Sequence, residues 1–349
     1  MMKRFFLTIL ILLLLAGGII YLNKTRVVKK ELLSISGTTM GTSYHIKLVP
    51  ETEENIDSST LKVKIDSRLS EIDQKMSTYK ENSDISRFNR HVANEWMTIS
   101  AETFTVIAMG QQVSKISDGA FDITVGKLVN LWGFGPAIHI EAIPDATTIQ
   151  TLLSQLGYHK LELGQTPPAL RKANKNIYLD LSAIAKGYAV DAIAKLLLEN
   201  QINNFLVEIG GEIITHGEKR QHQPWVVGIE SPLSQQRSIR KRLQLQNAAM
   251  ATSGDYRNYF EEQGVRYSHT IDPATGYPIK HKLASVTVIA NSCMSADALA
   301  TAIMVMGPVK GLEFASQQQL AIFMLVKQDD QFIEKYSPAF VPYLKTPEE

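Results

Sequence analysis

Cysteine is almost missing from this chain, since Cys293 is the only one among its 349 residues. A single cysteine excludes an intramolecular disulfide and a metal cluster built on several thiolates, so the redox compartment cannot be inferred from disulfides. Cys293 stands between Ser292 and Met294. This setting favours a buried small residue over the alternative of a reactive nucleophile.

The chain also lacks an excess of either charge. Its 36 Lys and Arg residues and 35 Asp and Glu residues leave a formal charge of +1, and no basic run is interleaved with aromatic residues. This balance gives no reason to expect a polyanionic partner, so we expect no nucleic-acid binding. With 44% apolar and 20% charged residues, the composition is that of an ordinary globular protein.

Internal repeats, low-complexity tracts and interdomain linkers after residue 33 are absent from the sequence as well. Typical domains have roughly 100 to 200 residues, so the length alone allows one large domain or two ordinary ones. Because no linker divides the chain, we expect residues 31–349 to form a single domain.

One long apolar run is present, from Phe5 to Leu22, and Lys3 and Arg4 precede it. As a helix rising ~1.5 Å per residue, this run comes close to spanning a hydrocarbon core of ~30 Å. It predicts a secretory signal or a membrane anchor, with a basic linker, within residues 1–30. Residues 16–18 are small enough for cleavage, but the apolar run continues past them, which favours a retained anchor.

Basic residues flank both ends of this run, which weakens the positive-inside rule as a guide to orientation. The layout of an export signal still predicts that the rest of the chain lies outside the cytoplasm.

Apolar periodicity predicts the secondary structure. Helices are expected at 57–76, 83–89, 101–117, 183–198 and 296–306, with Ser83 and Ser295 as caps. Strands are expected in the second half of 35–49 and at 176–181, 204–209, 212–215, 225–230, 236–245, 265–271 and 283–290. Short strands joined by turns predict an α+β fold with mainly antiparallel or mixed sheets and packed helices. The N-terminal hydrophobic helix would precede this fold.

Two glycine-containing segments interrupt the pattern. Residues 37–42 predict a bend in which Gly37 and Gly41 let the backbone approach a neighbouring strand or a ligand. Residues 131–136 are rich in Gly and aromatic residues and predict an irregular loop. Such a loop either lines a pocket or packs on its own rings.

Residues 268–276 combine an imidazole, hydroxyls and a carboxylate in a short stretch. Asp272, Pro273 and Gly276 have ordinary turn chemistry, because Asp bonds the backbone ahead of it, Pro presets φ and Gly accepts a positive φ. Taken alone, this segment predicts a hairpin turn with His269 at a strand end.

Two pairs of polar residues have spacings that suit anion or cation binding. Asp297 and Thr301 lie four residues apart on one helix face and can share a hard cation such as Mg²⁺, although Asp in a first turn also favours the helix dipole. Asp180 and Lys186 lie near the N-terminal end of the helix expected at 183–198. That end suits a phosphate, and the pair could equally form a structural ion pair.

Eight segments, in chain order, closely resemble the FAD:protein FMN transferases, the ApbE family. They are TMGT (39–42), MSTY (76–79), GAFDITVG (119–126), LVNLWGFG (128–135), DLSAIAKG (180–187), TSGDYRNY (252–259), SHTIDP (268–273) and ADALAT (296–301). The resemblance covers roughly residues 35–340. One such segment is weak evidence, whereas the ordered set is highly specific.

The resemblance implies an activity and a site. The family splits FAD at its pyrophosphate, transfers FMN to a threonine of an acceptor protein and releases AMP, with Mg²⁺ required. It implies that His269 is the base for the threonine hydroxyl and that Mg²⁺ is held by the Ala183 carbonyl, Asp297 and Thr301. It also implies FAD contacts at Met40, Tyr79, Ala120, Phe121, Asp122, Asp180, Lys186 and Ile271.

Elementary chemistry agrees with these roles. A threonine hydroxyl is a poor nucleophile at neutral pH and needs a base, and an imidazole titrates in the right range. Met40, Tyr79 and Phe121 are suitable walls for the flat rings of the flavin or the adenine. The same residues would also serve a Mg²⁺-dependent FAD pyrophosphatase, and a flavin-binding module without chemistry is a further alternative.

Two observations concern attachment and partners. Many relatives carry a lipidated cysteine that is absent here, so attachment would depend on the N-terminal helix, at a bacterial inner membrane with the domain facing the periplasm. Family acceptors carry threonine in a Ser-Gly-Ala-Thr-like site, and this chain has only the scrambled Ala-Thr-Ser-Gly at 251–254. We therefore expect a separate acceptor, a flavoprotein subunit of a membrane redox complex.

Overall fold

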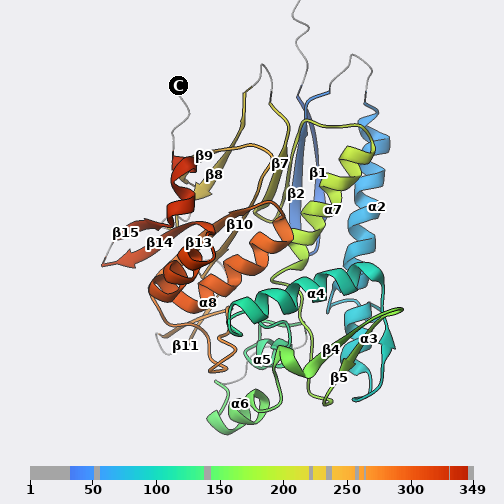
Figure 1. Ribbon diagram of the computed structural model, residues 1–349, viewed down its shortest axis with the longest axis vertical. Coiled ribbons are helices and arrows are strands. Elements are labelled where there is room, and N and C mark those ends of the chain that lie inside the picture. The colour runs from blue at the N-terminus through green and yellow to red at the C-terminus, as the bar shows by residue number, and fades with distance from the viewer. Residues whose placement is uncertain are drawn as a thin grey trace, which may run out of the picture.

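The computed structural model describes residues 32–50, 56–136, 143–219, 223–232, 238–255, 259–262, 265–329 and 331–344. The anchor expected in residues 1–30 lies outside these residues and stays a prediction. The ribbon is shown in Figure 1.

An antiparallel sheet of eight strands forms the centre of the fold. The strand order is β1 (Leu33–Thr39), β2 (Thr42–Leu48), β6 (Phe205–Ile209), β7 (Glu212–His216), β10 (Ala249–Gly254), β13 (Leu283–Ala290), β14 (Ala321–Gln328) and β15 (Gln331–Tyr336). Every neighbouring pair in this sheet is antiparallel. The α+β class with antiparallel pairing is therefore confirmed.

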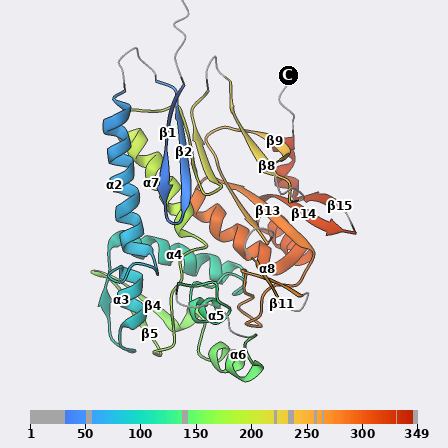
Figure 2. The same cartoon turned by 180° about the vertical axis from the view of Figure 1, so that it is seen from behind.

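Three helices cover one face of this sheet, as Figures 1 and 2 show from opposite sides. They are α2 (Ser58–Met76), α7 (Ala185–Glu199) and α8 (Cys293–Gln317), and α4 (Ala101–Ile116) packs against α8. Their apolar faces form the main core with inward side chains of the strands, such as Ile46, Val207 and Val286. Removal of these apolar side chains from water favours folding.

The opposite face is covered by a hairpin and a short 3₁₀ helix. The hairpin is β8 (Trp225–Glu230) with β9 (Ile239–Leu245), and the 3₁₀ helix is η3 (Pro338–Leu344). Trp225, Leu243 and Phe340 bury the outward side chains Met250 and Phe323 of the sheet. Because both faces are covered, β13 is buried along nearly its whole length instead of alternating between buried and exposed residues.

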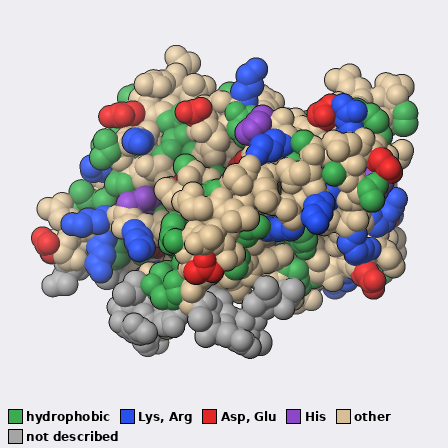
Figure 3. All heavy atoms as spheres, turned by 90° about the horizontal axis from the view of Figure 1, so that it is seen from below, with side chains coloured by type: hydrophobic (Ala, Val, Ile, Leu, Met, Phe, Trp, Pro, Cys, Tyr) green, Lys and Arg blue, Asp and Glu red, His purple; other side chains and the backbone are tan. Residues whose placement is uncertain are grey.

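The remaining elements gather at one end of the molecule, the lower end in Figures 1 and 2. They are α3 (Asp84–Arg90), β3 (Met97–Thr98), α5 (Gly126–Leu131), α6 (Ala146–Leu153), η1 (Tyr158–Lys160), β4 (Leu161–Gln165), β5 (Pro168–Lys172), β11 (Tyr259–Glu262) and β12 (Val265–Ser268). A separate small core of Trp132, Ile149, Tyr267 and Ile271 stabilises this region. Figure 3 views this end, where charged side chains of both signs are scattered over the surface.

The predicted helices are confirmed in position, and one predicted cap is wrong. Ser83 caps α3 as expected, by accepting a hydrogen bond from the Ser86 N–H. Ser292 caps α8 in place of Ser295, and its hydroxyl accepts from the Ser295 N–H. The helix thus begins three residues earlier than predicted. It continues past residue 306 through a kink at Gly307 and Pro308.

Two strand predictions need correction. Residues 176–181 are not a strand, since only Tyr178 forms an isolated bridge, to Val125. Ile177, Leu179 and Leu181 are buried, so the alternation reflects packing of an extended segment and not pairing in a sheet. The strand expected at 265–271 ends at Ser268. The chain then enters the loop that carries His269.

Helix α8 is long and apolar enough to cross a membrane by length and composition alone. However, 56% of its most apolar window is buried inside the fold, and it packs on α7, β10 and β13. We therefore assign it as the central helix of the core.

Candidate functional site

A cavity of about 1080 Å³ lies where the β1–β2 turn, the ends of α2 and α7, the first half of α8 and the loop after β12 meet. All twelve residues assigned to the site from the sequence line this one cavity. They are Met40, Tyr79, Ala120, Phe121, Asp122, Asp180, Ala183, Lys186, His269, Ile271, Asp297 and Thr301. Residues from six separate segments of the chain are thereby brought together.

The β1–β2 turn places Met40 at the cavity. Met40 and Gly41 have φ values of 47° and 73°, so both central residues of this two-residue hairpin are left-handed. That geometry matches the twist of the flanking strands and favours Gly at one position. The bend predicted at 37–42 is confirmed, and Gly37 approaches a neighbouring strand, because a Cβ there would lie 2.6 Å from Cε1 of Tyr44.

Close contact between α7 and α8 brings Asp297 into the cavity. The N–H of Gly187 donates to Oδ2 of Asp297 at 3.0 Å. A Cβ at Gly187 would collide with the backbone carbonyl of Cys293 and lie 2.7 Å from the Cα of Met294. Glycine is thus required for the helices to approach this closely. Since the Gly187 N–H bonds Asp297, the carbonyl of Ala183 loses the donor that a continuous helix would supply.

Asp191 on α7 fixes the start of α8. Its carboxylate accepts hydrogen bonds from the N–H groups of Cys293 and Met294, at 2.8 and 2.9 Å, and from the Ser292 hydroxyl at 2.8 Å. These bonds satisfy N–H groups that a helix start leaves free. Burial raises the pKa of Asp191, while these donors oppose the rise. Sequence reasoning missed Asp191, which sets the position of Asp297 one turn further on.

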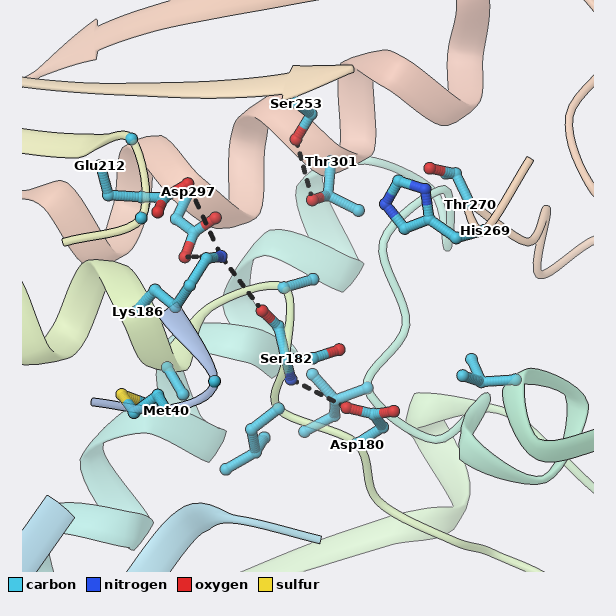
Figure 4. A pocket seen from close by; sticks show the side chains of 18 of the residues that line it. Met40, Asp180, Ser182, Lys186, Glu212, Ser253, His269, Thr270, Asp297 and Thr301 are labelled. Carbon is cyan, nitrogen blue, oxygen red and sulfur yellow. Dashed lines mark hydrogen bonds and ion pairs between the residues drawn. The ribbon is translucent and has the colours of Figure 1, made fainter. Parts of the chain in front are cut away.

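Lys186 contacts two buried carboxylates, as Figure 4 shows. Its Nζ is 3.6 Å from Oε1 of Glu212, 3.9 Å from Oδ2 of Asp297 and 3.5 Å from the carbonyl oxygen of Ser182. Burial alone would lower the pKa of Lys186. The charges of Asp297 and Glu212 outweigh burial and raise it, so the ammonium stays protonated.

Glu212 is a site residue that sequence reasoning missed. It is 4% exposed, lines the cavity, and its Oε2 has no hydrogen-bond partner among the described residues. Burial raises the pKa of both Glu212 and Asp297, and the charge of Lys186 opposes the rise in each. One ammonium is therefore shared by two carboxylates. The only sequence signal was an acidic residue directly after the Gly210–Gly211 bend.

Asp297 and Thr301 lie on one face of α8, as their spacing predicted, and both line the cavity. The Thr301 hydroxyl lies 3.2 Å from the hydroxyl of Ser253 on β10. Ala183 lines the same cavity, so a carboxylate, a hydroxyl and a backbone carbonyl are available there as oxygen donors. Mg²⁺ takes oxygen ligands and usually keeps several waters, so this set fits it. No cluster of three or more His, Cys, Asp or Glu suited to a metal occurs among the described residues.

The His269 loop is held by a hairpin turn, as predicted. Gly276, with φ of 76°, donates its N–H to the Asp272 carbonyl at 2.8 Å. The indole N–H of Trp132 donates to the carbonyl of Gly276 at 2.8 Å, and Ile271 is buried beside Trp132. These contacts fix the chain on the C-terminal side of His269. The imidazole therefore projects from a supported loop into the cavity (Figure 4).

The irregular loop predicted at 131–136 has both of the roles considered for it. Trp132 is buried in the small core with other aromatic rings, whereas Phe134 lines the cavity. Phe134 also packs edge-on against the His269 ring, with centroids 6.3 Å apart. The loop thus links the small core to the imidazole.

The segment from Ala120 to Asp122 borders the cavity and is bound to the fold. The Asp122 carboxylate accepts from the N–H and hydroxyl of Thr124, at 2.8 and 2.7 Å, and from the N–H of Tyr158 at 2.9 Å. Burial raises its pKa, and these donors oppose the rise. Phe121 is buried in the main core, so its ring only edges the cavity.

Tyr79 and Asp180 lie nearer to solvent. Tyr79 is 70% exposed at the rim of the cavity. Asp180 accepts a hydrogen bond from the Ser182 N–H at 2.8 Å. Within the described part of the chain, the ion-pair partners of Lys186 are Glu212 and Asp297. The alternative of an Asp180–Lys186 ion pair is therefore not what the structure shows.

Comparisons with known proteins agree with this geometry. The model of the ApbE family matches residues 40–324. A Vibrio cholerae protein named FAD:protein FMN transferase is 45% identical over 90% of this chain and 93% of its own length. A protein of the same name from Haemophilus influenzae is 41% identical over 91% of this chain and 93% of its own length.

Solved structures give the same result. The flavin transferase ApbE from Vibrio cholerae superposes with a TM-score of 0.83 at 42% identity, covering 90% of this chain and 99% of that chain. The apo flavinyl transferase ApbE from Pseudomonas stutzeri superposes with a TM-score of 0.83 at 38% identity, covering 90% and 97%. The chain therefore belongs to the ApbE family.

Proposed function

We infer that this chain is a flavin transferase that moves the FMN part of FAD to an acceptor protein and releases AMP. The observation that carries this inference is that all twelve residues assigned from the family segments line one cavity. Relatives at up to 45% identity, matched over most of their length, are named FAD:protein FMN transferase. The cavity is large enough for a dinucleotide, since ordinary ligand sites occupy roughly 300–1,000 Å³.

We propose that the acceptor group is a threonine hydroxyl and that His269 is its base. The threonine oxygen attacks the phosphorus of the FMN phosphate, and its proton passes to the imidazole. The phosphorus–oxygen bond to threonine forms while the bond to the AMP phosphate breaks, so AMP leaves with the bridging oxygen. His269 suits the role because it projects from a supported loop into the same cavity as Asp297 and Lys186.

The Ala183 carbonyl, Asp297 and Thr301 would hold Mg²⁺. When bound, the ion supplies positive charge to the phosphate oxygens, whose negative charge shifts as the pyrophosphate breaks. Two of these residues are held by hydrogen bonds within the protein, Asp297 by the Gly187 N–H and Thr301 by the Ser253 hydroxyl. This order reduces the cost of arranging the site when the substrate arrives.

We propose that the flavin and adenine rings lie against Met40, Tyr79 and the border formed by Ala120, Phe121 and Ile271. Lys186 sits in the first turn of α7, a helix of 15 residues. The partial positive charge at such an end favours an anion, and the ammonium adds to this. Lys186 would therefore face the pyrophosphate. Asp122 and Asp180 would contribute through the backbone segments that they hold.

We propose that the chain acts at the outer face of a bacterial inner membrane. The apolar run from Phe5 to Leu22 and the basic residues around it support an anchor. The acceptor would be a flavoprotein subunit of a membrane redox complex with a Ser-Gly-Ala-Thr-like site.

Incubation of the full-length chain with FAD, Mg²⁺ and a candidate acceptor tests the activity. We expect FMN to become covalently bound to the acceptor, as a mass increase on one peptide. FMN that appears only free in solution would identify a pyrophosphatase instead. FAD binding without loss of FAD, unaffected by substitution of Asp297 and Thr301, would identify a binding module.

A further inference from the structure

Glu212 is the one buried carboxylate of the cavity to which the proposed reaction gives no role. It lies on β7, 3.6 Å from the ammonium of Lys186, and its second oxygen has no hydrogen-bond partner among the described residues. An isolated buried acceptor of this kind is costly, so its retention in a cavity needs a physical reason. Figure 4 shows Glu212 and Asp297 on the same side of Lys186.

The reason follows from the position of Lys186. Its ammonium contacts the same carboxylate, Asp297, that would hold Mg²⁺. A divalent cation at Asp297 would place two further positive charges close to this ammonium. Because like charges repel strongly in a partly buried site, Lys186 must lose its contact with Asp297 as the cation binds.

Glu212 is the nearest alternative partner. Its Oε1 is already slightly closer to the Lys186 Nζ than the Asp297 oxygen is, 3.6 Å against 3.9 Å. A small side-chain rotation would complete this ion pair. The ammonium would then stay inside the cavity, where it faces the pyrophosphate, and would not be expelled into solvent.

We propose that Glu212 is a positioning residue that accepts Lys186 from Asp297 when the divalent cation binds. This proposal rests on the proposed function, because it assumes the cation site at Asp297. It assigns Glu212 an effect on cation affinity through Lys186, with no direct contact between Glu212 and the cation. Residues that support a metal ligand in this way change affinity when they are substituted.

The number of charges near Asp297 predicts the order of cation affinity among the variants. Glu212→Gln leaves Lys186 with Asp297 as its sole anionic partner, so the lysine competes with the cation and binding weakens. Lys186→Met removes the competitor, so binding is at least as tight as in the wild type. In the double variant the competitor and its acceptor are both gone, so binding returns close to the wild-type value.

The test is a titration of the full-length protein with Mn²⁺, without FAD, in which free Mn²⁺ is measured by electron paramagnetic resonance. We expect Glu212→Gln to weaken binding about tenfold or more. We expect the double variant Glu212→Gln/Lys186→Met to bind Mn²⁺ with an affinity within about threefold of the wild type. This difference is well below the effect of losing a residue that supports a metal ligand. Glu212→Asp keeps the charge and should lie between the wild type and Glu212→Gln.

Equal Mn²⁺ affinity in Glu212→Gln and wild type would overturn the proposal. A double variant as weak as Glu212→Gln alone would also overturn it, because the effect would then not pass through Lys186. Two Mn²⁺ ions per wild-type chain, one of them lost in Glu212→Gln, would make Glu212 a ligand instead. If Glu212→Gln does not fold, Glu212→Asp alone decides, and unchanged affinity in it contradicts the proposal.

Asp297→Asn separates this result from a failure of the proposed function. If wild-type Mn²⁺ binding survives Asp297→Asn, the cation site itself is wrong. If Asp297→Asn abolishes binding and Glu212→Gln does not weaken it, the cation site stands and only the role of Glu212 fails.

Discussion

Asp297 contacts other groups at the site. It is 4% exposed and contacts the Gly187 N–H and the Lys186 ammonium. A carboxylate placed in a buried position near a cation is stable only because these partners offset its loss of hydration. Substitution of Asp297 should therefore affect binding of the proposed cation without removing the cavity walls. Substitution of a residue at the rim would not distinguish these two effects as directly.

We predict that Asp297→Asn abolishes AMP release while FAD still binds, because the residues proposed to contact its rings are unchanged. AMP release would be followed by chromatography, and FAD binding by the quenching of flavin fluorescence. Ser316→Ala, on the exposed part of the same helix, is the control and should retain wild-type turnover. Normal turnover in Asp297→Asn would remove the cation from this position.

We predict that His269→Ala slows FMN transfer about 100-fold or more, the range for loss of a general base, while the Kd for FAD changes little. The measurements are turnover with a saturating acceptor and direct FAD binding. His45→Ala, an exposed histidine on β2, is the matched control. A large rise in the Kd at normal turnover would contradict the role as base.

The site residues found from the sequence share one property, which is that they lie in short continuous segments that resemble the family. Glu212 and Asp191 do not. Their importance comes from contacts across the fold, from Glu212 to Lys186 and from Asp191 to the start of α8. An isolated acidic residue in a strand or on a helix gives no periodic signal, so only the folded structure shows these roles.

At the scale of the elements, the contact between α7 and α8 determines the geometry of the site. We predict that Gly187→Ala lowers the free energy of unfolding by about 1–3 kcal/mol, the usual cost of overpacking, because the added methyl group meets backbone atoms. Gly110→Ala on α4 is the matched control. There the nearest atom, at 3.0 Å, belongs to the side chain of Ile123 and not to the backbone. Urea denaturation of both variants measures the difference, and equal effects would contradict the account.

A charge network joins three of the helices. Glu102 on α4 contacts Arg68 and Lys75 on α2, and it accepts a hydrogen bond from Tyr188 on α7 at 2.9 Å. The Arg68 guanidinium lowers the pKa of Glu102 to about 2, with burial opposing and Lys75 and Tyr188 assisting. Since this pKa is below that of the unfolded chain, the network stabilises the fold when Glu102 is ionised.

We predict that Glu102→Gln destabilises the protein by about 1 kcal/mol at neutral pH, because the network is partly exposed and screened. The difference from wild type should be constant above about pH 5 and disappear as the pH falls from about 4.5 towards 2. Urea unfolding across this range tests the prediction, with exposed Glu313→Gln as the control. A difference that grows as the pH falls would have the wrong sign.

The helices were predictable because local signals agree with the fold. Asp57 and Ser83 accept N–H bonds at the starts of α2 and α3, and the apolar positions of α2 are those that are buried. By contrast, β14 is a continuous apolar run without alternation, and α5 has no side-chain cap. Neither was predicted. Residues 176–181 alternate like a strand although no sheet pairs with them.

At the scale of the whole molecule, one sheet with helices on one face brings distant segments to a single cavity. The order of β10 between β7 and β13 places Ser253 beside Thr301, and β7 places Glu212 beside Lys186. The α+β class and antiparallel pairing followed from short strands joined by turns. The strand order did not, because it depends on long-range packing that local patterns do not encode.

The proposed transfer of FMN to a threonine is tested most directly by measuring whether AMP release requires the acceptor protein. The full-length chain would be incubated with FAD and Mg²⁺, alone, with an acceptor, and with the same acceptor carrying valine in place of its site threonine. We predict AMP release only with the intact acceptor, in an amount equal to the FMN bound to it. AMP released at the same rate in all three mixtures would contradict transfer and show that water, not a threonine, receives the FMN.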